Sequence, residues 1–133
     1  MCPLRLLPGL FLLALCGCSS GEPYPVPVRG TVSVDGKPLA EGKISFLTPG
    51  KVPEMLDIKD GQYTGKVNWG ERRVEIAAYR PYRVPDDAPA HLRPLMAQGK
   101  ENYLPRKYHR DSTLQAEVKA SGDNEFNFEL ASE

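Results

Sequence analysis

The chain reads VPVRGTVSV from Val26 to Val34, and its apolar residues occupy every second position. Side chains of a β-strand point alternately to the two faces of the sheet, so this alternation predicts a strand with one buried and one solvated face. The buried face would hold Val26, Val28, Gly30, Val32 and Val34. The next two residues are Asp35 and Gly36, a pair typical of tight hairpin turns.

The same alternation recurs through the rest of the chain. Ile44 and Phe46 mark a second strand, which we expect to form a hairpin with the first. A second pair, Asp60-Gly61, predicts another hairpin, and residues 73–80, 114–119 and 125–130 alternate in the same way. Seven short strands without sustained helical periodicity predict an all-β chain. We expect a single seven-stranded antiparallel β-sandwich of Greek-key type, with a small closed barrel as the alternative.

Residues 81–110 break this pattern. The stretch contains five prolines, at Pro81, Pro85, Pro89, Pro94 and Pro105. Proline lacks a backbone donor and fixes φ, which excludes one continuous helix or a central strand here. We expect a long loop with one or two helical turns within residues 92–98, and long loops often carry specificity. The alternative is a flap that packs over an open edge of the sandwich through Leu92, Leu95, Met96 and Tyr103.

The N-terminal segment has the features of a bacterial lipoprotein signal peptide. Arg5 precedes an apolar stretch too short to span a bilayer, and Leu15, Gly17 and Cys18 fit a lipobox. We predict a signal peptide of residues 1–17 and lipidation of Cys18, with an ordinary secretory signal or an uncleaved anchor as alternatives. The product would be lipid-anchored and extracytoplasmic, at the cell membrane or the outer membrane. Residues 18–27 are predicted to be a tether and residues 28–133 the folded domain.

Composition limits the partners and cofactors of such a domain. The chain has 17 Lys and Arg residues against 17 Asp and Glu residues, so no basic surface is expected to draw nucleic acid. Of the three cysteines, Cys2 and Cys16 would leave with the signal peptide and Cys18 would carry lipid. No disulfide, Cys-ligated metal or other cofactor is therefore expected in the domain.

Several runs of this sequence resemble a known family. Residues 28–46, with the pieces GTV and DGKPL, and the closing run FNFEL of residues 126–130 occur in the order typical of small planctomycete-type lipoproteins. Their domain is described as carboxypeptidase regulatory-like or transthyretin-like, and the resemblance spans nearly all of the mature domain. It implies a transthyretin-like (prealbumin-like) β-sandwich with a binding or structural role and no known ligand.

Aromatic and basic residues gather on both sides of the long loop. These side chains give large contact areas with polar ends, which suit a protein partner or a sugar ring. The candidate binding surface consists of Tyr79, Tyr82, Arg83, Tyr103, Arg106 and Tyr108. We expect a lipid-anchored binding or structural module of the cell envelope, with an envelope protein or a glycan as partner. The alternative use of Tyr103 and Tyr108 is to pack the base of the loop onto the sandwich.

No catalytic function is expected. His91 and His109 are the only histidines, neither begins an HxxE motif, and no GxSxG nucleophile elbow is present. The two histidines are weak metal candidates beside the loop aspartates. The chain also lacks the C-terminal YRGS signature of the transthyretin-related hydrolase of purine catabolism. The alternative function is a small hydrolase or metal-dependent enzyme on a transthyretin-like scaffold.

Overall fold

The computed structural model describes residues 21–133, so the predicted signal peptide and the lipidation site Cys18 lie outside the described residues. The described chain is all-β, as predicted, and each of the seven predicted segments forms a strand. These strands are β1 (Pro25–Val34), β3 (Glu41–Leu47), β4 (Glu54–Lys59), β5 (Gln62–Asn68), β6 (Gly70–Ala77), β9 (Gln115–Val118) and β10 (Phe128–Leu130). Three further strands are two or three residues long: β2 (Lys37–Pro38), β7 (Tyr79–Pro81) and β8 (Lys100–Asn102).

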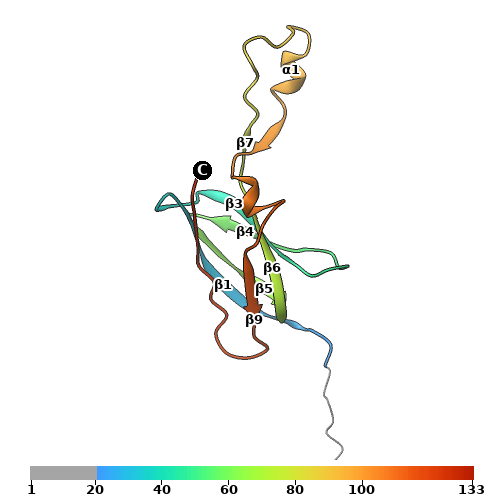
Figure 1. Cartoon of the computed structure of the whole chain (residues 1–133), viewed down its shortest axis with the longest axis vertical. Coiled ribbons are helices and arrows are strands. Elements are labelled where there is room, and N and C mark those ends of the chain that lie inside the picture. The colour runs from blue at the N-terminus through green and yellow to red at the C-terminus, as the bar shows by residue number, and fades with distance from the viewer. Residues whose placement is uncertain (1–20) are drawn as a thin grey trace, which may run out of the picture.

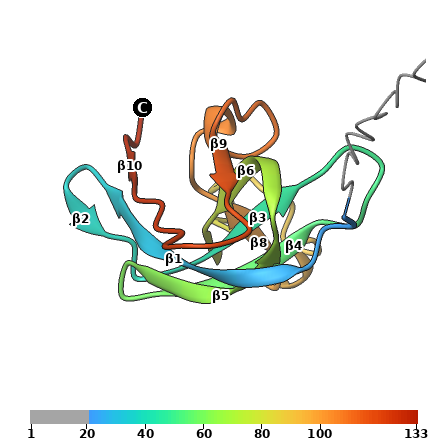
Figure 2. The ribbon, with the colours of Figure 1, turned by 90° about the horizontal axis from the view of Figure 1, so that it is seen from below.

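The main sheet runs in the order β10-β1-β5-β4-β3-β6-β9, with β2 added beside β1 (Figures 1 and 2). Strands β7 and β8 form a separate two-stranded sheet. Seen along its length, the main sheet curls so that its two edge strands, β10 and β9, come round to the same side (Figure 2). The turn from Lys119 to Asn124 connects these edges, and the backbone amide of Arg29 on β1 donates to the Asn124 carbonyl at 3.0 Å.

The core fills the inside of this curl. Most of the alternating residues predicted to be buried are buried in the structure, including Val28, Ile44 and Ile76. Val34, Leu56, Leu114, Phe126 and Phe128 are only partly buried. The outward positions between them are mostly exposed and polar, as on β1, where the pattern of burial alternates without a break from Pro25 to Val32. Strand β1 begins at Pro25, three residues before the predicted start of the domain, because Val26 already packs into the core.

Two pairings differ from the prediction. Strands β1 and β3 do not form a hairpin. After the turn at Asp35 and Gly36 only the two residues of β2 pair with β1, and β3 pairs instead with β4 and β6. The Asp35-Gly36 turn has the expected positive φ angles of 51° and 79°. The sheet is also not wholly antiparallel, because β10 runs parallel to β1, with Val32 opposite Phe128 and Val34 opposite Leu130.

Gly30 is the one position on the inner face of β1 that is not a valine, and the structure explains why. A Cβ atom added to Gly30 would lie 1.8 Å from the carbonyl oxygen of Phe126 and 2.5 Å from the hydroxyl of Tyr63. That hydroxyl donates to the same Phe126 carbonyl at 2.6 Å. The missing side chain thus lets the C-terminal segment cross close over β1.

Residues 79–103, which we call the arm, stand clear of the main sheet (Figure 1). Strand β7 leaves the sheet directly after β6, β8 returns, and the tip carries the short helix α1 (Arg93–Met96). This helix lies within the predicted residues 92–98 and confirms that part of the loop prediction. A 3₁₀ turn, η1 (Arg106–Tyr108), follows where the chain rejoins the sheet. Within residues 21–133, none of the helices is long and apolar enough to cross a bilayer.

Candidate binding surface

The arm is ordered by its own contacts and adds nothing to the core. None of the residues from Tyr79 to Tyr103 is buried. Leu92, Leu95 and Tyr103 are among the most exposed large apolar residues of the described chain. The alternative expectation, a flap packed over the sheet by these side chains, is therefore wrong. The arm presents them to the surroundings instead.

Short-range contacts fix the base of the arm. Tyr79, Arg80 and Pro81 pair with Asn102, Glu101 and Lys100. The Arg80 guanidinium contacts the Glu101 carboxylate at 2.7 Å and lies 5.6 Å from the centre of the Tyr103 ring. The side-chain oxygen of Asn102 accepts from the backbone amides of Ala78 and Leu104, both of which are buried. The side chain of Asn102 therefore connects the base of the arm to the core residues that precede and follow it.

Tyr79 lies at the junction of the arm and the outer face of the sheet. Its side chain is 55% exposed and borders three adjoining hollows of about 460, 440 and 330 Å³. The largest hollow reaches across the outer face of β3 and β6 to the base of the arm, where it meets Asn102, His109 and Arg110. We call this set of hollows the Tyr79 groove. An exposed ring beside amide and charged groups can contact both the apolar and the polar parts of a ligand.

The charged side chains that line the Tyr79 groove are of both signs, and two pairs of them are in contact. Lys43 contacts Asp57 at 2.7 Å across β3 and β4, and this hydrogen bond lowers the pKa of the Asp57 carboxyl. Arg73 pairs with Glu75 along β6 and also donates to the carbonyl of Ser112 at 3.2 Å. A groove lined by charges of both signs offers a ligand hydrogen-bond donors as well as acceptors.

The structure separates the six predicted surface residues into two groups. Tyr79, Tyr82, Arg83 and Tyr103 belong to the arm and are at least partly exposed. Arg106 and Tyr108 lie on η1, beside the sheet rather than on the arm.

Tyr108 has a structural role. Its ring packs against the core, and its hydroxyl accepts from the backbone amide of Ala131 at 2.8 Å. Arg106 is exposed and pairs with Asp111 at 3.3 Å. The packing alternative thus holds for Tyr108, whereas Tyr103 remains on the arm.

The two histidines lie on different parts of the chain. His91 is exposed near the tip of the arm, and His109 follows η1, where its Nε2 atom lies 3.1 Å from the carbonyl oxygen of Leu104. Among residues 21–133, no three or more His, Cys, Asp or Glu side chains gather as a metal site would require.

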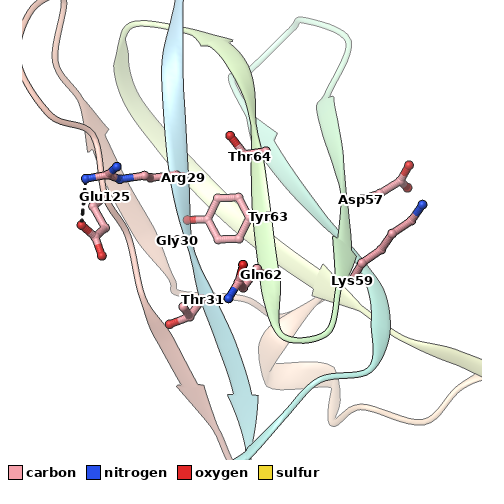
Figure 3. A pocket seen from close by; sticks show the side chains of 9 residues that line it. All are labelled: Arg29, Gly30, Thr31, Asp57, Lys59, Gln62, Tyr63, Thr64 and Glu125. Atoms are coloured by element: carbon pink, nitrogen blue, oxygen red, sulfur yellow. Dashed lines mark ion pairs between the residues drawn. The ribbon is translucent and has the colours of Figure 1, made fainter.

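A further hollow of about 410 Å³ was not predicted from the sequence (Figure 3). It lies beside β1, β4 and β5, and its rim includes Arg29 and Glu125, which pair at 3.6 Å. Tyr63 forms part of its wall, and burial raises the pKa of this phenol. The alternating pattern gave no sign of this hollow because its outward residues come from strands that are distant in sequence.

Comparison with family models, curated proteins and solved structures finds no match to this chain. The role of the arm and of the Tyr79 groove therefore rests on their geometry and chemistry.

Proposed function

We propose that this protein is a lipid-anchored, extracytoplasmic binding module of the cell envelope, without catalytic activity, whose contact surface is the arm and the Tyr79 groove. The observation that carries the proposal is the exposed arm itself. A chain of 25 residues that buries no side chain contributes little to the stability of the domain, and its order suits it to present a surface. Tyrosine and arginine side chains dominate its base, as in many protein and glycan contact surfaces.

The position of the arm supports this proposal. In Figure 1 the arm stands at one end of the long axis and the chain enters the fold at the other end. Strand β6 connects the two ends, since its first residue Gly70 lies near the start of β1 and its last residue Ala77 precedes the arm. If Cys18 carries lipid, this arrangement would hold the arm away from the bilayer and free for a partner.

The fold supports the resemblance to transthyretin-like domains. We propose that the curled sheet is an open form of their sandwich, in which β3, β6 and β9 face β1 and β5 across a shared core of Val28, Val67, Phe46 and Val74. Such domains are similar to the β-sandwich accessory modules beside carboxypeptidase catalytic domains, which agrees with a binding or structural role.

The anchor is tested separately from the arm. We expect Cys18→Ala to abolish metabolic labelling with radioactive palmitate and to move the protein from the membrane to the soluble fraction. The matched control is Cys16→Ala, which leaves the predicted lipobox cysteine in place and should be labelled normally. Labelling that persists in Cys18→Ala would overturn the anchor.

The arm is tested with a variant in which Asn-Gly replaces residues 82–99. Pro81 and Lys100 are cross-strand partners, so a two-residue turn can join them. The intact protein and this variant are each cross-linked in native envelope, and the captured protein and glycan are compared. A component recovered with the intact protein and lost both in the shortened variant and in Tyr82→Ala/Arg83→Ala supports the proposal. Equal recovery by all three would show that the arm is not the contact surface.

A further inference from the structure

We infer that the side of the sheet on which the chain enters the fold rests on the lipid surface itself, through the loop of residues 48–53 and the neighbouring Tyr24 and Trp69. This inference rests on the proposed lipid anchor and deepens it, because it assigns a lipid-facing surface to the folded domain. The partner is the interfacial region of a bilayer.

The strand register brings these segments to one end of the sheet. Pro25 at the start of β1 lies opposite Asn68 at the end of β5, and β6 begins at Gly70 beside them. Leu47, the last residue of β3, lies opposite Arg73 near the start of β6. The loop of residues 48–53 follows directly, and it lies on the same side of the sheet as the start of β1 in Figures 1 and 2.

The side chains at this end suit a lipid interface. Val52 is 87% exposed, the highest value among the large apolar residues of the described chain, and it is held between Lys51 and Pro53. Tyr24 is about half exposed and packs edge-on against Trp69, with 6.2 Å between ring centres, and Trp69 itself is partly buried against the core. Tyrosine and tryptophan concentrate at membrane interfaces, where an apolar ring meets water and headgroups.

A short tether would keep this end of the sheet close to the bilayer if Cys18 carries lipid. Six residues lie between Cys18 and Pro25, so the start of β1 can lie at most about 25 Å from the attachment point. At this distance the local concentration of lipid is so high that even a weak contact is occupied. The exposed charges in this region are of both signs, with Lys51, Lys66 and Lys119 near Glu22, Glu71, Glu117 and Asp123, so the contact should not require anionic lipid.

The test uses the processed form, residues 18–133, coupled through the Cys18 thiol to a maleimide phospholipid in neutral phosphatidylcholine vesicles. Chemical coupling makes the result independent of whether cells attach lipid to Cys18, so failure of this inference and failure of the anchor can be told apart. Hydrogen exchange is measured for the coupled and the free protein. We expect exchange of the amides of residues 48–53 to slow at least threefold on coupling, while exchange in the arm stays unchanged.

Two variants with matched changes sharpen this test. Val52→Asp should abolish the slowing, whereas Leu95→Asp, at an apolar position on the arm that is 67% exposed, should leave it intact. Trp69 is the only tryptophan of the chain, so quenching of its fluorescence by brominated lipid gives a second readout. This quenching should decrease in Val52→Asp and stay unchanged in Leu95→Asp. Unchanged exchange of residues 48–53 on coupling, or slowing that persists in Val52→Asp, would overturn the inference.

Discussion

Replacement of Gly30 by alanine should destabilise this fold far more than an exposed single-methyl change. The added Cβ would lie 1.8 Å from the Phe126 carbonyl oxygen and 2.5 Å from the Tyr63 hydroxyl, so the crossing segment must move outward. Overpacking of this kind costs about 1–3 kcal/mol. Disturbing the hydrogen bond from Tyr63 to Phe126 adds about 1 kcal/mol to this cost. Alanine also lowers the conformational entropy of the unfolded chain relative to glycine, which offsets about 0.4–1 kcal/mol of the loss. The net loss of unfolding free energy is about 2–3 kcal/mol, or roughly 10 °C in Tm.

Urea denaturation followed by circular dichroism measures this loss. Gly21→Ala is the matched control, because no atom lies within 4 Å of its added Cβ and the change should be neutral. Tyr63→Phe separates the two contributions, since it removes the hydroxyl but leaves the Phe126 carbonyl in place. We expect Gly30→Ala to remain destabilising in that background. A Gly30→Ala protein within about 0.5 kcal/mol of the parent would refute the close crossing of the C-terminal segment over β1.

Three further predictions concern titration, a buried cation and the arm. Burial raises the pKa of Tyr63 above its ordinary value of about 10. The stability that depends on the neutral phenol is therefore present below pH 10 and is lost as the pH rises through the folded-state pKa. Between pH 8 and 12, the denaturation midpoint of Tyr63→Phe should fall less than that of the parent protein. Arg72 is 7% exposed, lies near Glu54 and donates to the carbonyls of Trp69 and Glu71. Arg72→Met should therefore lower the unfolding free energy measured in urea by about 2–3 kcal/mol. The same change at exposed Lys43 should lower it by less than about 1 kcal/mol. Replacing residues 82–99 by Asn-Gly should change Tm by no more than about 2 °C in calorimetry, because the arm buries no side chain; a drop of 10 °C would show that it supports the core.

The strands could be predicted because alternation reports burial directly. On β1 and β6 the residues at every second position are buried, and this local property needs no knowledge of the partner strand. The pairings are set by residues distant in sequence, which is why the predicted hairpin of β1 with β3 failed. After Pro38 the side chain of Leu39 enters the core, and the chain crosses to β4 instead of continuing beside β1.

The candidate surface was predictable in composition but not in shape. Five prolines and clustered tyrosines marked residues 79–108 as an irregular stretch with binding character. Strands β7 and β8 are only three residues long, too short for a periodic signal, so the outward projection of the arm could not be inferred. The structural role of Tyr108 was also hidden, because it depends on a hydrogen bond to Ala131, 23 residues away.

The parallel pairing of β10 with β1 has a consequence for how the chain acquires its fold. Thr31 on β1 donates from its backbone amide to the side chain of Asn127, 96 residues later, and Asp35 donates to the Leu130 carbonyl. One edge of β1 therefore stays uncovered until nearly the whole chain has been synthesised. Contacts between such distant residues slow folding. The sheet would therefore close only after the last strand had emerged from the ribosome.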